Sequence, residues 1–291
     1  MLAMLAFTTL SFTACNNDKD DEPVNEDVIL ATPNYADDAI RLKFDDPVKY
    51  DDEFNLTELE LTESGYYLLK LEKANPFAVK ATRLSVRTYK FLNDLFSKAE
   101  NVYNLKNFGT VKITSNGSKY TVELTFNGNT ITVTASKNGI TISDSSRTTL
   151  NLCRTWTIQS TRVQIEGESG FYQEAGCDLN SILAYVQQHA QISDEVQSNQ
   201  VISRISFSNN GTFTLVYANG LTDRAQWQWV SPANGTLTYT WEHNDMGYSF
   251  INGQASVQIH QKGTPSRLLL SGTVKNNKGE NKNITVTVNM I

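Results

Sequence analysis

Residues 212–229 read TFTLVYANGLTDRAQWQW, and this stretch carries the pattern that decides the fold. Apolar and polar residues alternate on both sides of Asn219-Gly220. Since side chains of a strand alternate between its two faces, Phe213 and Tyr217 share one face of the first run, and Trp227 lies on the apolar face of the second. Asn-Gly tolerates the positive φ angles of a type I′ turn. The stretch therefore predicts an antiparallel hairpin with one apolar face.

The same dipeptide recurs along the chain at intervals of about one strand length. Such turns between alternating runs predict antiparallel meanders rather than helices. In the first half they separate expected strands at 109–115, 119–126 and 130–135, with a possible fourth at 139–143. The seven Asn-Gly pairs stand at 116–117, 127–128, 138–139, 210–211, 219–220, 234–235 and 252–253.

The segment before these strands mixes two periodicities. Residues 56–71 alternate around a Gly-containing turn and predict a hairpin. Residues 84–90 alternate as a strand would, whereas the apolar residues of 92–100 follow helical spacing. The sequence predicts an N-terminal antiparallel β domain over 53–146, with a short helix at 92–100.

A polar, turn-like stretch at 143–149 marks the expected domain boundary, and residues 147–291 form the second expected domain. Its first strand is expected at 150–163 and its second at 201–207. Between them, Asp178 can cap a helix that runs to Ala190 with one apolar face. Counting all runs gives eight strands, each with one apolar and one polar face. Eight such antiparallel strands can close into a barrel.

The N-terminus carries an apolar run, Leu2 to Phe12, that is too short to span a membrane. Phe12-Thr13-Ala14-Cys15 resembles the lipobox of bacterial lipoproteins, which implies cleavage of a signal peptide (1–14) and a lipid on Cys15. The acidic run after Cys15 is similar to the surface-export signal of Bacteroidota lipoproteins, or serves as a solvated spacer. The resemblance implies a lipoprotein of the cell envelope, anchored in the outer membrane and surface-exposed.

Charge is distributed unevenly along the chain. Residues 16–60 hold 15 Asp and Glu against 4 Lys and Arg, and residues 61–291 hold 16 against 21. The acidic residues and prolines of 15–52 predict a lipidated tether. The mildly basic remainder has no clustered Lys and Arg, so nucleic acid is not an expected partner.

A second resemblance concerns the second domain. Residues 153–158 read CRTWTI, residues 205–213 read ISFSNNGTF, and the Trp229 strand follows. These motifs look like the lipocalin-like domains of Bacteroidota lipoproteins, although Arg154 stands where that family has glycine in Gly-x-Trp. The resemblance covers roughly residues 150–291 and implies a lipocalin-like up-and-down β-barrel there. Together with the strand and helix patterns above, the sequence predicts an all-β, minor-α chain, in which an N-terminal antiparallel β-sheet domain precedes this eight-stranded barrel with its one inserted helix. It also implies that such barrels sometimes hold an internal ligand.

Large aromatic residues concentrate on the apolar face of the barrel strands. They form the wall of a site for a small lipophilic or glycan ligand, or they fill the core, because an eight-stranded barrel is just wide enough for either. The candidate ligand-binding residues are Trp156, Phe213, Tyr217, Trp227, Trp229, Tyr239 and Trp241.

Two cysteines remain after Cys15. Cys153 and Cys177 form either a disulfide, which an envelope compartment tolerates, or two free buried thiols. A bridge would stabilise the fold by about 3 kcal/mol. The sequence contains no Cys-x-x-Cys, so zinc and thiol redox chemistry are not expected.

Catalytic motifs are absent from the sequence. It contains no Gly-x-Ser-x-Gly elbow, phosphate-binding glycine loop, dinucleotide fingerprint or His-x-x-x-His spacing. We therefore expect no enzyme, cofactor or metal. The leading hypothesis is a membrane-anchored module that binds a small ligand. The alternative is an interaction protein whose barrel core is packed and whose surface docks onto an envelope protein.

Overall fold

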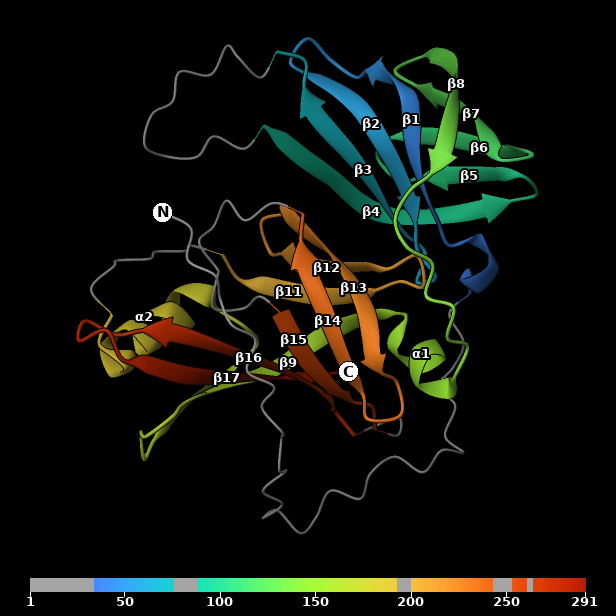
Figure 1. Ribbon diagram of the computed structural model, residues 1–291. Helices are drawn as coiled ribbons and strands as arrows, with labels where there is room; N and C mark the ends of the chain where they lie inside the picture. The colour runs from blue at the N-terminus through green and yellow to red at the C-terminus, as the bar shows by residue number, and fades with distance from the viewer. Residues whose placement is uncertain (1–33, 76–87, 193–199, 243–252, 261–263) are drawn as a thin grey trace, which may run out of the picture.

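The computed structural model describes residues 34–75, 88–192, 200–242, 253–260 and 264–291. Over these residues the chain forms two closed antiparallel barrels, one after the other (Figure 1). The first has its eight strands in sequence order and is closed by pairing of its first and last strands. A 3-10 turn, η1 (Ala36–Asp38), precedes its strands: β1 (Ile40–Lys49), β2 (Phe54–Leu61), β3 (Tyr66–Lys73), β4 (Tyr89–Ala99), β5 (Val102–Leu105), β6 (Gly109–Asn116), β7 (Lys119–Phe126) and β8 (Asn129–Lys137).

The second barrel confirms the all-β class and the expected closure of eight strands. The strand β9 pairs with both β11 and β17, and this closes the ring, while β10 pairs with the second half of β9. Its elements are α1 (Arg147–Leu152), β9 (Thr155–Ile165), β10 (Phe171–Ala175), α2 (Leu179–Ala190), β11 (Ile202–Phe207), β12 (Thr212–Tyr217), β13 (Thr222–Ser231), β14 (Thr236–Trp241), β15 (Gly253–Gln258), β16 (Ser266–Lys275) and β17 (Asn281–Met290).

Five of the Asn-Gly pairs lie at hairpin turns, as expected. They join β6 to β7, β7 to β8, β11 to β12, β12 to β13 and β13 to β14, and the glycine of each has positive φ. Gly235 cannot be replaced easily, because a Cβ there would lie 2.2 Å from the Val257 carbonyl oxygen. The pair at 138–139 lies instead between the barrels. Asn252 falls outside the described residues.

Three expectations for the first half are corrected. Residues 92–100 belong mostly to β4, which is a strand and not a helix. Residues 40–49, which were assigned to the expected tether (15–52), form β1 and pair with β2 and β8. Pro47 is accommodated there because the β1–β2 register shifts between Lys43 and Val48, and an irregularity suits a residue that lacks an N–H. Residues 139–143 form no strand.

The domain boundary is also more structured than expected. Residues 147–152 form α1, where the first strand of the second barrel was expected, and β9 begins at Thr155. The side chain of Ser146 caps this helix by accepting a hydrogen bond from the Thr149 amide. The expected helix after Asp178 is confirmed as α2, and β10 is an additional strand before it.

Candidate functional site

The predicted aromatic residues of the second barrel mostly pack against one another. The Phe207 and Phe213 rings stack with centroids 4.6 Å apart, and Trp227 meets Phe207 edge-on at 5.6 Å. Tyr239 and Trp229 contact this cluster through Phe213 and Trp227. Such geometries are typical of aromatic cores. This part of the barrel interior is therefore filled by its own side chains.

Hydrogen bonds hold three of the indoles in place. The Trp156 Nε1–H donates to the Leu152 carbonyl oxygen at 3.0 Å, and the Trp227 Nε1–H donates to the Ser208 carbonyl oxygen at 3.0 Å. The Trp229 Nε1–H donates to the Thr149 Oγ1 at 2.7 Å and so ties β13 to α1. These side chains are structural, and they do not border the cavity described next.

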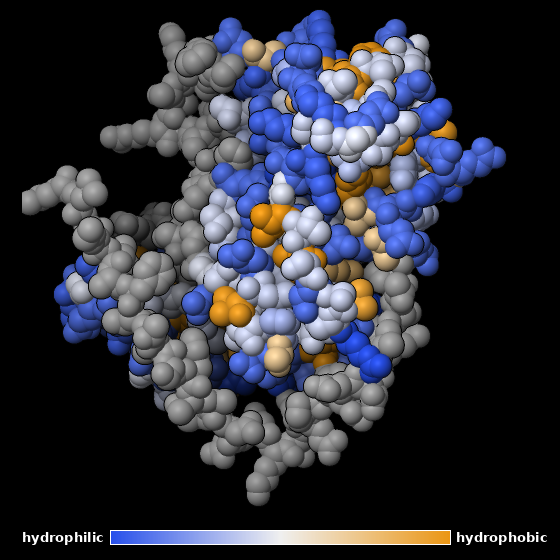
Figure 2. All heavy atoms as spheres, turned by 45° about the vertical axis from the view of Figure 1, so that its right-hand side comes forward, coloured by the Kyte–Doolittle hydropathy of each residue, from blue (hydrophilic) through white to orange (hydrophobic). Residues whose placement is uncertain are grey.

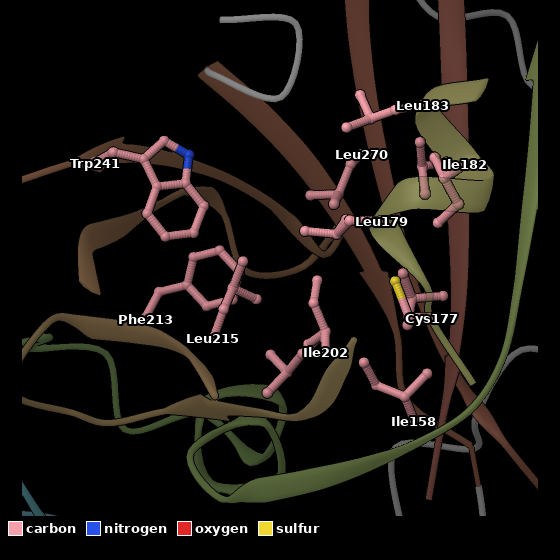
Figure 3. Close-up of a pocket in the computed structure, with 13 residues that line it drawn as sticks. Ile158, Cys177, Leu179, Ile182, Leu183, Ile202, Phe213, Leu215, Trp241 and Leu270 are labelled. Atoms are coloured by element: carbon pink, nitrogen blue, oxygen red, sulfur yellow. The ribbon is translucent and has the colours of Figure 1, made fainter. Parts of the chain in front are cut away.

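A largely enclosed cavity lies between this aromatic cluster and α2. Figure 3 shows Phe213 and Trp241 on one side of it, and Cys177 with the side chains of α2 on the other. Its volume is about 40 Å³, which is room for about three water-sized groups. The lining residues are Ile158, Cys177, Leu179, Ile182, Leu183, Ile202, Ile205, Phe213, Leu215, Trp241, Leu270, Val286 and Val288.

The helix α2 forms one wall of the cavity because of its local sequence. The Asp178 carboxylate accepts a hydrogen bond from the Asn180 amide at 3.0 Å and caps the first turn. Leu179, Ile182 and Leu183 then project from one face and are buried. Gln191 ends the helix in the left-handed conformation. The chain therefore places an apolar helix face against the barrel interior.

The cavity offers binding by apolar contact and no acid–base chemistry. All its lining side chains are hydrocarbon or aromatic apart from the Cys177 thiol. Burial raises the pKa of that thiol to about 12, so it stays protonated at neutral pH. Among the described residues no group of three or more His, Cys, Asp or Glu side chains is placed to hold a metal ion.

The structure brings only part of the predicted site together. Of the seven candidate residues, Phe213 and Trp241 line the cavity, whereas the other five do not. The residues missed by the prediction come mainly from α2 and from the aliphatic faces of β9, β11, β16 and β17. The apolar face of the 178–190 helix was the available signal, since such a face must pack on something.

The candidate disulfide is not formed, and Cys153 and Cys177 are free buried thiols. Cys153 ends α1, just before β9 begins at Thr155. Cys177 follows Gly176, which pairs with Gln159 and Thr161 farther along β9. The strand residues from Thr155 to Gln159 alone span roughly 13 Å, whereas a disulfide needs Cα atoms within about 7 Å. The spacing along β9 therefore keeps the two thiols apart.

We expect both thiols to resist modification in the folded protein. Burial raises the pKa of both, so neither accessibility nor thiolate character favours reaction. In native buffer, Ellman's reagent should label neither Cys153 nor Cys177 within minutes, and in 6 M guanidinium it should label both. Peptide mass spectrometry distinguishes them from Cys15. Rapid native labelling of either residue would contradict this placement.

A second buried feature lies where the two barrels meet. We call it the interface cluster. On β2, Leu59 and Leu61 face the first barrel's core, and the alternating Glu58 and Glu60 face outward onto the second barrel. The cluster consists of Arg41, Glu58, Glu60 and Lys70 from the first barrel with Arg224 and Glu242 from the second.

Arg224 is the centre of the cluster. Its Nη2 lies 2.6 Å from the Glu58 Oε2 and 2.9 Å from the Glu242 Oε2, and its Nη1 lies 3.4 Å from the Glu60 Oε2. Arg41 bridges the same groups, with its Nη2 3.1 Å from the Glu58 Oε2 and 2.6 Å from the Glu242 Oε1. The guanidinium of Arg224 also lies 4.7 Å from the centre of the Phe91 ring. The two barrels are thus joined by a buried ionic contact.

Two carboxyls of this cluster are perturbed in opposite directions. Burial raises the pKa of the fully buried Glu60, although Arg224 and Arg41 oppose it. Burial opposes ionisation of Glu58, but Arg224, Arg41 and Lys70 outweigh it and lower the pKa of Glu58 to about 2. Glu58 is therefore ionised at all physiological pH values. Glu58 and its basic partners stabilise the contact between the barrels. A substrate could not reach them, since Arg224 is only 1% exposed.

Comparison of the sequence with known proteins does not identify this chain. No protein family and no curated protein matches the chain. Within the described part of the chain, no helix has the length and apolar character needed to cross a membrane. The fold is compatible with the lipocalin-like class of ligand-binding barrels, and the cavity under α2 is the feature from which a function can be argued.

Proposed function

We propose that this chain is a membrane-anchored, surface-exposed lipoprotein without enzymatic activity, whose second barrel binds a small lipophilic molecule under α2. The observation that carries the proposal is the wholly apolar cavity between α2 and the Phe213–Trp241 wall. The lipobox at Cys15 supports the anchor, and it lies outside the described residues. An apolar cavity supports a lipophilic ligand over a glycan, because buried sugar hydroxyls would lack partners.

The size of the cavity limits the ligand. Its volume of about 40 Å³ is well below the roughly 300 Å³ of pockets that enclose drug-sized molecules. The ligand is therefore a small apolar molecule, or the end of an alkyl chain whose remainder lies outside the cavity. Apolar burial gives about 0.8 kcal/mol per CH₂ group, so three or four groups buried in the cavity contribute about 2.4–3.2 kcal/mol, and contacts of the ligand outside the cavity must supply the rest of the affinity.

Filling the cavity tests the proposal. In Leu183→Trp the larger side chain should occupy the space, at a cost in stability of about 1–3 kcal/mol, and should abolish binding. Gln188→Trp is the matched control, because residue 188 is exposed on the same helix. The full chain is incubated with a bacterial lipid extract and compared by native and denaturing mass spectrometry. We expect an adduct, lost on denaturation, for the wild type and Gln188→Trp only. The absence of any wild-type adduct would overturn the proposal.

A second candidate, an interaction protein with a packed barrel, is favoured by the filled aromatic cluster around Trp227. Such a protein needs an apolar patch to dock a partner. On the face in Figure 2, hydrophobic residues form small separate patches among hydrophilic ones. Exposed large apolar side chains come from several different elements, including Leu150, Phe171 and Val230. This dispersion favours the ligand-binding proposal. If no adduct forms, affinity capture from envelope extracts tests the second candidate.

A further inference from the structure

The contact between the barrels contains one more acidic than basic group. Glu63 follows directly after β2 and lies next to the interface cluster. This residue is 2% exposed. Lys70 also forms an ion pair with Glu72, which is half exposed and lies at the surface. The acids of this group are the buried Glu58, Glu60 and Glu63 and the partly buried Glu242, and the bases are Arg41, Lys70 and Arg224.

Glu63 is the member of this group without a basic partner. Its Oε1 accepts a hydrogen bond from the Asn209 amide of the second barrel at 2.6 Å. Its Oε2 is buried and has no hydrogen-bond partner in the described part of the chain. Among the described residues, the ion pairs of Arg41, Lys70 and Arg224 go to Glu58, Glu60, Glu242 or the half-exposed Glu72, and none goes to Glu63.

The groups around Glu63 do not replace the missing cation. Glu60 on β2 adds a negative charge when it is ionised, although burial raises its own pKa as well. The β11–β12 loop contributes Ser208 and Asn209, which are neutral and whose hydrogen bonds to Glu63 only partly offset the effect of burial. Arg41 and Arg224 are engaged with Glu58 and Glu242. Cys153 lies close by at the end of α1, followed by Arg154, whose Nε–H donates to the Asn151 carbonyl oxygen. A buried carboxylate in such surroundings favours its neutral form.

We propose that the inter-barrel contact holds one proton on Glu63, and that loss of this proton above neutral pH loosens the first barrel from the second. The excess of acids over bases and the missing cation carry the proposal. In support, burial and, less strongly, the Glu60 charge raise the pKa of Glu63 to about 7.

The direction of the pH effect follows from the difference between the pKa of Glu63 in the folded and in the unfolded chain. In the unfolded chain a glutamate has a pKa near 4.5, so the folded state binds the proton more tightly. The contribution of Glu63 to stability is complete below about pH 4.5 and is lost as the pH rises to about 7. Glu58 acts oppositely: its contribution is complete above about pH 4.5 and is lost as the pH falls towards 2. The two groups therefore act in separate pH windows.

The direct test is titration of the full chain labelled with ¹³C at the Glu side-chain carboxyl, followed by NMR. Glu63→Gln identifies the Glu63 signal by its absence. We expect this signal to titrate near pH 7. A Glu63 midpoint below about 5 would overturn the proposal. If the variant did not fold, a wild-type spectrum in which no Glu carboxyl titrates near pH 7 would overturn it as well.

A second measurement asks whether the proton matters for the contact. Cys153 is buried beside Glu63, so its alkylation by iodoacetamide reports opening there. At pH 8 the wild type should be labelled at Cys153 at least tenfold faster than Glu63→Gln, and at pH 6 the two rates should be equal. Comparison at the same pH cancels the titration of the thiol itself. Glu123→Gln, the matched control, should behave as the wild type. Equal rates at both pH values would mean that the proton has no effect on the contact, and the proposal would fail.

Discussion

Replacing Arg224 with Met is expected to lower the free energy of unfolding by about 3–5 kcal/mol. The methionine fills much of the arginine stem's volume but removes the charge that contacts Glu58, Glu60 and Glu242. Arg41 and Lys70 then face the carboxyl groups of Glu58, Glu60 and Glu242 alone. Breaking a buried ionic network from one side is costly because the remaining charges stay desolvated and unpaired. Urea denaturation of the full chain, followed by tryptophan fluorescence and circular dichroism, measures the loss.

A surface ion pair provides the control for this experiment. The Lys119 Nζ lies 2.6 Å from the Asp45 Oδ2, as close as Arg224 to Glu58, but both side chains are substantially exposed. Lys119→Met should therefore cost no more than about 1 kcal/mol. If Arg224→Met cost as little as the control, the interface cluster would contribute nothing to joining the barrels. Loss of coincidence between the two spectroscopic transitions would show in addition that the barrels unfold separately.

Replacing Trp227 with Ala is expected to cost about 3–5 kcal/mol, because it leaves a large cavity in the centre of the second barrel. The indole is fully buried, meets Phe207 and Trp229 edge-on, and donates a hydrogen bond to the Ser208 carbonyl oxygen. Trp227→Phe should cost clearly less, since it keeps an aromatic ring and loses the N–H. The urea midpoints of the two full-length variants and of the wild type measure this order of stabilities.

Val230 supplies the matched control in the same strand. It is 61% exposed, so Val230→Ala should change stability by no more than about 0.5 kcal/mol. A small loss for Trp227→Ala would indicate that the cluster is loosely packed and that ligand space extends into it. That result would return Trp227 to the candidate ligand-binding residues, from which its packing now removes it.

Local patterns were sufficient for most of the second barrel, although they missed α1 and β10. Period-two alternation in residues such as 212–217, broken by Asn-Gly at a turn, sets strand faces through the backbone alone. The Asp178 cap and the apolar face behind it are equally local, and α2 lies where they predict. These features depend on neighbours within a few residues, which is why one sequence is enough to find them.

The misassigned strand β4 shows where local patterns fail. Phe91 faces outward and Leu92 inward, because they pair with Lys70 and Leu69 respectively. Both faces carry apolar residues, since the second barrel covers the outer one through Arg224. Apolar residues on both faces of a strand give spacings of three and four that resemble a helix. The cause lies more than 100 residues away, and no local window contains it.

The sequence by itself determined the all-β class, the antiparallel hairpins, the eight-strand count of the second barrel and its inserted helix, because backbone periodicity and turn chemistry act locally. Only the tertiary structure decided which faces meet. Glu58 and Glu60 alternate with leucines as a solvated face would, yet they are buried against Arg224. Likewise, the packing of α2 against β9, β16 and β17 places the cavity beside Phe213 and Trp241 and leaves Trp227 in the core. These outcomes depend on long-range contacts, which are fixed when barrels close and pack together.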